Sequence, residues 1–193
     1  MNHILVPIGS KENATNTLQY AIDFAKELQA KVFVFRAYKV LSKAGTLINV
    51  NDILERETNL YLQAIISNID TKGVDVKMIS AKGGTIESIH SVKSELGVDL
   101  IVVGPRSNSI KEEVFLGSTS GSIVKQTDIP VLIVPENYKF IPFKVVLTAF
   151  KSGKLDQPGV LTPLQLIKKL FNSKINLLLV KTPNYKTEDL TVD

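Results

Sequence analysis

The sequence lacks cysteine and tryptophan altogether and has only two histidines among its 193 residues. Without cysteine, the chain has no disulfide framework, no thiolate metal site and no cysteine nucleophile. No apolar run reaches the roughly 20 residues that a membrane helix needs. The first residues have neither the basic flank nor the long apolar segment of a signal peptide. We therefore expect a cytoplasmic protein that does not enter a membrane.

Several common motifs of catalysis and phosphate binding are also missing. The chain has neither a Gly-x4-Gly-Lys-Ser/Thr phosphate loop nor a Gly-x-Gly-x2-Gly dinucleotide fingerprint. With His3 at the start of a strand and His90 on a helix, a Ser-His-Asp site has little support. No cluster of His, Asp and Glu suggests a metal site, so Mg²⁺ is expected only together with bound phosphates.

The net charge of +4 is unevenly distributed along the chain. Residues 1–137 contain 14 Lys and Arg against 15 Asp and Glu, a net of −1. Residues 138–193 contain 9 Lys against 4 acidic residues, a net of +5. These lysines are scattered and few aromatic residues lie among them, so a solvated basic surface explains them better than a nucleic-acid site. We expect no nucleic-acid partner.

Strand and helix patterns alternate over residues 1–137. Short, continuous apolar runs such as Leu100–Val103 are typical of strands buried on both faces of a parallel sheet. The alternation of five strands with four helices predicts a doubly wound parallel sheet of the α/β class. The expected strands are residues 3–7, 31–38, 74–79, 100–103 and 131–134, and the expected helices are residues 14–28, 51–69, 85–96 and a short run after residue 117.

The segment after the fourth strand has the residues of a phosphate-binding loop. Gly104 ends the strand, Ser107 follows three residues later, and Gly117 precedes Ser118 and Thr119 at the start of a helix. Free backbone N–H groups and the positive end of the helix dipole meet at such a helix start, which favours phosphate. A buried strand followed by a plain connecting loop is the alternative, because isolated glycine spacings recur by chance.

This spacing closely resembles the Gly-x2-Gly-x9-Gly-Ser/Thr signature of ATP-binding universal stress proteins, and the flanking strands also match over residues 1–137. The resemblance implies a sheet order of 3-2-1-4-5 and an adenine nucleotide, ATP or AMP, bound without efficient catalysis. In that family the loop wraps the phosphates, which assigns Gly104, Ser107, Gly117, Ser118 and Thr119 to the phosphates here. Ser107 departs from the signature, which has glycine at this position.

The resemblance also implies an adenosine side, where this chain departs again. Family members commonly have an Asp after the first strand that contacts the adenosine; Gly9 stands in its place, next to Ile8. Ala37 aligns with the contact at the end of the second strand. Gly9 and Ser107 favour a second hypothesis, a degenerate module that acts only in dimerisation or signalling. A weak ATPase is a third hypothesis, although no residue stands out as a water-orienting base.

Residues 138–143 are expected to form a linker, after which the pattern of the first strand, helix and strand returns. Residues 144–193 resemble the first third of a second domain of the kind found in tandem universal stress proteins, so we expect a partial βαβ unit and an incomplete domain. Edge strands with apolar residues tend to pair with other chains. We expect a homodimer that forms through residues 131–134 or through the C-terminal unit. We also expect that the first domain or a second chain buries the apolar residues Val145, Leu147, Leu177 and Leu179.

Overall fold

The computed structural model describes residues 1–9, 14–39, 50–105, 117–150 and 159–179 of the chain. It divides into two compact units, Met1–Phe140 and Ile141–Asp193. Each unit is described by itself. Across the described parts of the chain, no helix combines the length and the apolar character needed to cross a bilayer.

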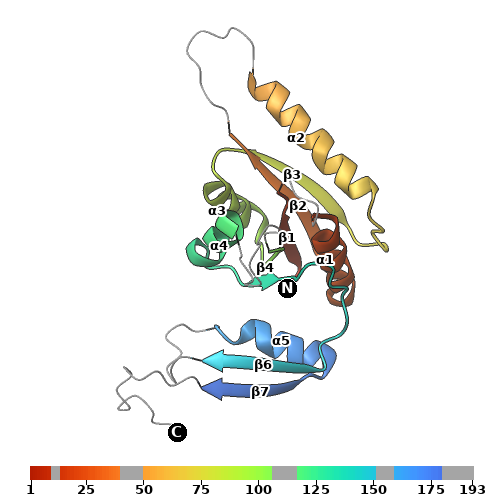
Figure 1. Ribbon diagram of the computed structural model, residues 1–193, viewed down its shortest axis with the longest axis vertical. Helices are drawn as coiled ribbons and strands as arrows, with labels where there is room; N and C mark the ends of the chain where they lie inside the picture. Colours follow the sequence, from red (N-terminus) through yellow and green to blue (C-terminus); the bar gives the residue numbers. More distant parts are fainter. Residues whose placement is uncertain (10–13, 40–49, 106–116, 151–158, 180–193) are drawn as a thin grey trace, which may run out of the picture. The chain divides into compact units, whose positions relative to one another are not determined.

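The first unit is a five-stranded sheet in which all neighbouring strands run parallel, in the order β3-β2-β1-β4-β5. This confirms the predicted α/β class and strand order. Helices α1 and α2 lie on one side of the sheet, and α3 and α4 lie on the other (Figure 1). The elements of this unit are β1 (His3–Pro7), α1 (Ala14–Leu28), β2 (Lys31–Tyr38), α2 (Val50–Ser67), β3 (Val76–Lys82), α3 (Thr85–Leu96), β4 (Leu100–Val103), α4 (Gly117–Gln126) and β5 (Val131–Ile133).

The central strands are buried on both faces, as their continuous apolar sequences predict. Each residue of β4 is buried, and so are Ile4, Leu5 and Val6 of β1. Alternate residues of the strands contribute to a core cluster with α3 and α4, which includes Leu5, Phe35 and Ile89. On the opposite side of the sheet, α1 buries seven residues. The sheet therefore separates two hydrophobic layers, each covered by helices.

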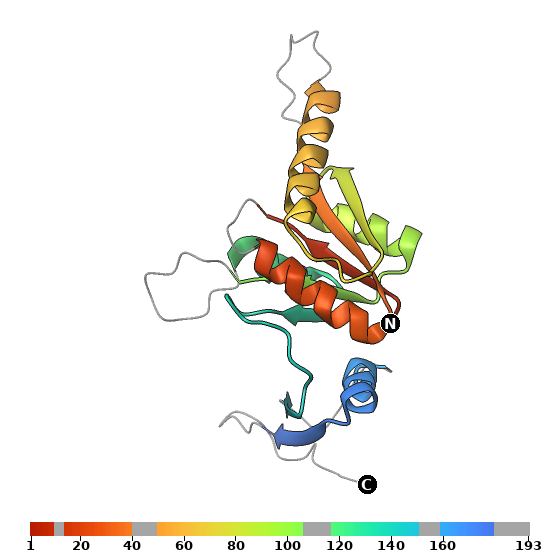
Figure 2. The ribbon, with the colours of Figure 1, turned by 90° about the vertical axis from the view of Figure 1, so that its right-hand side faces the viewer.

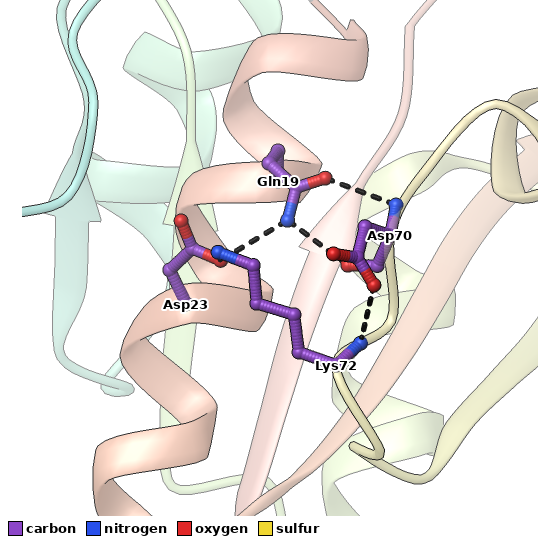
Figure 3. A network of polar contacts seen from close by, with 4 residues as sticks. All are labelled: Gln19, Asp23, Asp70 and Lys72. Carbon is purple, nitrogen blue, oxygen red and sulfur yellow. Dashed lines mark hydrogen bonds and ion pairs between the residues drawn. The ribbon is translucent and has the colours of Figure 1, made fainter.

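A polar network joins α1 to the loop between α2 and β3 (Figure 3). The Gln19 amide donates to Asp23 Oδ1 and to the Asp70 carbonyl, both at 3.0 Å, and accepts from the Asp70 N–H at 3.2 Å. Lys72 lies 2.8 Å from Asp23, and this hydrogen bond raises the pKa of the Lys72 ammonium. The loop is thereby held against α1 before β3 begins.

Replacing Gln19 with leucine is expected to lower the free energy of unfolding by about 1–2 kcal/mol, because two backbone groups of Asp70 lose their side-chain partner. Urea denaturation monitored by circular dichroism measures this change. Gln63→Leu is a matched control, since Gln63 is exposed on α2. Equal stabilities of the two variants would contradict the role assigned to the network.

Aromatic residues of the expected linker pack against α1. The Phe140 ring lies 5.5 Å from the Tyr20 ring and 5.8 Å from the Phe24 ring, and the Tyr138 ring lies 6.4 Å from Tyr20. Burial, followed by the nearby Tyr138, raises the pKa of Tyr20 from 10.0 to about 12. The segment after β5 thus packs against two aromatic side chains of α1.

The raised pKa of Tyr20 predicts a loss of stability in alkaline solution. Below the ordinary pKa of 10.0 the phenol is protonated in both the folded and the unfolded chain. As the pH rises from about 10 to about 12, the unfolded chain ionises first, so the free energy of unfolding falls. Tyr20→Phe is expected to make this fall shallower, as measured by urea denaturation at a series of pH values. An identical alkaline fall in the variant would contradict the assignment.

The second unit is a small βαβ element, made of β6 (Val145–Phe150), α5 (Thr162–Phe171) and β7 (Lys174–Leu179). Its two strands pair in parallel, with Val145 opposite Lys174 and Phe150 opposite Leu179. Helix α5 and strand β7 are drawn in blue in Figure 2. The Phe143 and Phe171 rings meet edge to face at 5.3 Å, and Ser173 Oγ donates to the Phe143 carbonyl. The expected strand-helix-strand pattern is therefore present. That residues 144–193 begin a second domain of the same type stays a prediction.

Candidate functional site

The strand order reverses between β1 and β4, which lie next to each other at the centre of the sheet. Ile4 pairs with Leu100 and Leu5 with Ile101. From β1 the chain continues outward to β2 and β3, whereas from β4 it continues to β5 on the other side. Ligands of open α/β sheets bind at such a switch point, outside the carboxyl ends of the strands. The segments that begin at Ile8 and at Gly104 leave the sheet at the carboxyl ends of these two strands.

Gly104 is surrounded by α1 and α4. A Cβ atom at this position would lie 2.6 Å from Thr17 Oγ1 in α1. Ser120 Oγ in α4 donates to the Gly104 carbonyl at 3.0 Å. A larger residue at position 104 would therefore force the Thr17 hydroxyl to move, so the packing of the chain itself favours glycine here. The contact with Thr17 could not be found from the sequence, whereas Ser120 belongs to the hydroxyl-rich run that begins at Ser118.

This contact predicts that Gly104→Ala lowers the free energy of unfolding by about 1–3 kcal/mol, since the added methyl group overpacks the site. Thr17→Ala removes the hydroxyl and should recover most of the loss. The two single variants and the double variant form a cycle that isolates their coupling energy by urea denaturation. Strictly additive effects would contradict a direct clash between the two positions.

Ile8 and Gly9 follow β1 but differ in their surroundings. The Ile8 side chain is buried, and its N–H extends the sheet by donating to the Phe35 carbonyl at 2.8 Å. Gly9 is exposed, and among the residues that the structure describes a Cβ atom built on Gly9 meets no atom within 4 Å. Neither close packing nor a positive φ demands glycine at position 9. A larger side chain would therefore fit there.

Tyr61 of α2 and Arg36 of β2 lie beside Gly9. No pattern in the sequence indicated that either residue belongs to this site. The Tyr61 hydroxyl donates to the Gly9 carbonyl at 2.6 Å. The Arg36 guanidinium lies 4.0 Å from the centroid of the Tyr61 ring, in a cation–π contact. Within the described part of the chain, the buried Arg36 Nη1 has no hydrogen-bond partner. These contacts fix the backbone after β1 and give this side of the switch point a positive charge.

Ala37 lies near the carboxyl end of β2, opposite Ala81 of β3, and packs against the core cluster. One residue further on, the Tyr38 carbonyl accepts from the Gly83 N–H at 2.9 Å. Gly83 has a φ of +132°, so the backbone conformation of the turn accounts for this glycine. Ala37 thus lies at the same edge of the sheet as Ile8.

The predicted phosphate residues are only partly described. Helix α4 begins at Gly117, as expected, and includes Ser118. Thr119 is exposed in its first turn. Ser107 lies in residues 106–116, outside the described residues. As at the start of any α-helix, the first N–H groups of α4 have no partner within the helix itself.

Neither histidine lies at the switch point. His3 begins β1, at the opposite end of the strand from Gly9, and its ring meets that of Phe33 edge to face at 5.5 Å. His90 Nε2 lies 3.2 Å from the Gln126 carbonyl. Across the described residues, no group of three or more His, Cys, Asp or Glu side chains could hold a metal ion.

Comparison with known proteins identifies the family of the chain. The family model described as "Universal stress protein family" matches residues 1–135. The universal stress protein YxiE of Bacillus subtilis is 30% identical over 145 residues, which cover 69% of this chain and 98% of the relative. The universal stress protein MJ0531 of Methanocaldococcus jannaschii is 24% identical over 141 residues, covering 70% of this chain and 83% of the relative.

Solved structures agree with this match at the level of the fold. UspA from Lactobacillus plantarum superposes with a TM-score of 0.55 and 20% identity, covering 69% of this chain and 97% of the other. A universal stress protein from Archaeoglobus fulgidus gives a TM-score of 0.52 and 21% identity, covering 69% and 98%. With the sheet order, the signature spacing and the family model in agreement, the chain belongs to the universal stress protein family.

Proposed function

We propose that the chain binds an adenine nucleotide, ATP or AMP, at the switch point between β1 and β4. The observation that carries this proposal is the arrangement of the signature. Gly104 leaves the carboxyl end of β4, and Gly117 begins the helix that follows. The phosphates would bind at Gly104, Ser107 and the first turn of α4, where backbone N–H groups and the helix dipole favour negative charge.

The adenosine would bind on the other side of the same edge, near Ile8, Gly9 and Ala37. Ile8 is buried and its N–H is used by the sheet, so its contribution would come from its carbonyl group. Mg²⁺ would enter only with the phosphates, which supply the oxygen ligands it prefers. We propose a cytoplasmic location for this binding protein, which cell fractionation tests.

We further propose that the chain does not catalyse nucleotide hydrolysis efficiently. A hydrolytic site needs a base within hydrogen-bond reach of the attacking water. His3 lies at the far end of β1, and the His90 ring is engaged with the end of α4. Phosphate release measured over many equivalents of ATP tests this proposal, and sustained turnover would contradict it.

A second candidate function is a module that has lost its nucleotide and acts in dimerisation or signalling. Two observations favour it: Gly9 lacks the acidic group of the family pattern, and the packing against Thr17 by itself accounts for Gly104. Calorimetric titration with ATP and with AMP, each with Mg²⁺, separates the two functions. Saturable heat supports the nucleotide site, whereas no detectable binding at millimolar nucleotide would leave the second function.

Self-association is the remaining part of the proposal, and we propose a homodimer. The sequence offers two surfaces for it, the edge strand β5 with Val134 and the C-terminal βαβ unit. In β5, Val131 and Leu132 are partly buried and Ile133 is 37% exposed; Val134, which follows the strand, is 1% exposed. Strand β5 therefore leaves little apolar surface to cover.

A further inference from the structure

The guanidinium of Arg36 in β2 carries a positive charge that has no partner among the described residues. Its Nη1 atom is buried without a hydrogen bond, and none of the ion pairs formed between described residues includes this side chain. The residue as a whole is only partly buried. A buried donor of a charged group costs free energy while it stays unsatisfied, so it calls for an explanation. A ligand that supplies the missing acceptor is one such explanation.

The position of Arg36 connects it with the adenosine side of the proposed nucleotide site. The Ile8 N–H donates to the Phe35 carbonyl, and in a parallel ladder this bond places Arg36 beside Ile8. The guanidinium stacks on the Tyr61 ring, and the hydroxyl of the same ring donates to the Gly9 carbonyl. A single tyrosine ring therefore links the guanidinium to the backbone that follows β1.

The described residues around this guanidinium supply no carboxylate to neutralise it. Glu55 of α2 accepts from the Tyr38 hydroxyl at 3.3 Å, two positions after Arg36 in β2. At position 9 the family pattern has an aspartate, whereas Gly9 has no side chain. The adenosine side of this site thus has a cation where the family pattern has an anion.

The chemistry of the ribose determines which ligand this change of charge favours. A carboxylate accepts hydrogen bonds from free ribose hydroxyls, but it repels a phosphate attached to one of them. An arginine has the opposite preference, because its planar guanidinium donates two parallel hydrogen bonds to phosphate oxygens. A site with the arginine and without the aspartate therefore favours a ribose that carries a phosphate.

The phosphates on the 5′ carbon are not the expected partners of Arg36. They are assigned to Gly104 and to the start of α4, and β1 lies between β4 and β2 in the sheet. With about 4.8 Å between neighbouring strands, β2 and β4 are roughly 10 Å apart. The 2′ and 3′ oxygens of a ribose lie on the opposite face of the ring from the 5′ carbon. A phosphate on either oxygen can therefore face β2 while the 5′ phosphate binds at α4.

We infer that the site prefers an adenine nucleotide with an additional phosphate on its ribose, at the 2′ or the 3′ oxygen, and that Arg36 binds this phosphate. The inference rests on the proposed function, since it concerns the same nucleotide site. It makes Arg36 a specificity-determining residue. Tyr61 is a positioning residue, because its ring holds the guanidinium while its hydroxyl holds the backbone at Gly9.

Calorimetric titration with AMP, ADP, adenosine 2′,5′-bisphosphate and adenosine 3′,5′-bisphosphate tests the inference. At least one bisphosphate is expected to bind the wild-type chain at least about tenfold more tightly than AMP, because it gains a charge-assisted contact. ADP has the same number of phosphates, all on the 5′ side, so it separates the effect of position from that of total charge. Arg36→Gln is expected to abolish the preference for the bisphosphate and to leave the affinities for AMP and ADP nearly unchanged.

Two further variants complete the experiment. Arg56→Gln is the matched control, because it removes the same charge from an exposed arginine of α2 and should keep the preference. Gly9→Asp leaves Arg36 in place but adds a carboxylate that pairs with the guanidinium and repels a ribose phosphate, so the preference should shift toward AMP. Circular dichroism checks that each variant is folded. If Arg36→Gln does not fold, the wild-type preference and Gly9→Asp decide the result.

The outcomes separate this inference from the proposed function. If AMP binds but neither bisphosphate binds more tightly, or if the preference persists in a folded Arg36→Gln chain, the inference is wrong and the nucleotide site remains. If no nucleotide binds at millimolar concentration, the proposed function fails and the inference fails with it.

Discussion

Gly117→Val is expected to weaken ATP binding by at least about 100-fold, which corresponds to about 2.8 kcal/mol of binding free energy. Helix α4 begins at this residue, immediately after the signature loop. Glycine at such a position allows the backbone N–H groups to approach a phosphate closely. A branched side chain would keep the phosphate away from those donors and would also occupy the space of the ligand.

The fold is expected to survive this change, so binding and folding can be measured separately. Gly121→Val is the matched control, because Gly121 lies in the same helix and a Cβ atom there meets no atom of the described part of the chain within 4 Å. Calorimetric titration with ATP should give wild-type affinity for Gly121→Val and no saturable heat for Gly117→Val. If a folded Gly117→Val chain bound ATP as tightly as the wild type, the phosphates would have to bind elsewhere.

The buried strands could be predicted from the sequence because each of them is a short, uninterrupted run of apolar residues. In β4, four consecutive apolar residues are typical of a strand that is covered on both faces. The order of the strands, in contrast, follows from long-range pairing that no local pattern contains. It came from the resemblance to a family, and the pairing of β1 with both β2 and β4 confirms it.

The boundaries of strands were predicted less accurately where a turn determines the residue at which the strand begins. The third strand was expected at residues 74–79, but β3 runs from Val76 to Lys82. Gly73 has a φ of +82°, and the Val74 N–H donates to the Thr71 carbonyl, so a turn occupies the expected start of the strand. At its other end, β3 continues because Ala81 and Lys82 pair with the last residues of β2.

The surroundings of the candidate site were the least predictable part. Tyr61 lies 52 positions from Gly9 in the sequence, yet its hydroxyl binds the Gly9 carbonyl. Thr17 and Gly104 lie 87 positions apart in the sequence and meet only because α1 packs beside the end of β4. A glycine can thus be favoured by packing, by the conformation of a turn or by a ligand. Only the folded structure shows that packing against Thr17 favours Gly104, whereas the positive φ of a turn favours Gly83.

The structure makes position 9 the clearest place to test the departure from the family pattern. The resemblance implies an aspartate here whose carboxylate contacts the adenosine. Gly9 has no side chain and cannot make this contact. Because no atom of the described residues lies within 4 Å of a Cβ added at position 9, Gly9→Asp is not expected to overpack the site. The Tyr61 hydroxyl binds the backbone carbonyl of this residue, so the substitution leaves that contact in place.

Gly9→Asp combined with Ser107→Gly is expected to tighten ATP binding about tenfold, since one charge-assisted hydrogen bond to the ligand contributes about 1.5–3 kcal/mol, part of which is offset by desolvation of the carboxylate. Calorimetric titration with ATP measures the change. Gly9→Asn with the same Ser107→Gly substitution is the matched control, because the amide has the shape of the carboxylate without its charge.

The Arg36 guanidinium lies near position 9, so an ion pair with it is a second possible effect of the Gly9→Asp substitution. Arg36 stacks on the ring of Tyr61, and its Nη1 has no partner within the described residues, so a carboxylate at position 9 can also pair with the guanidinium. Pairing with Arg36 would raise the melting temperature of the ligand-free chain, whereas a contact with adenosine would raise only the affinity for the nucleotide. A variant that binds ATP no more tightly than the wild type would show that neither Gly9 nor Ser107 limits this site.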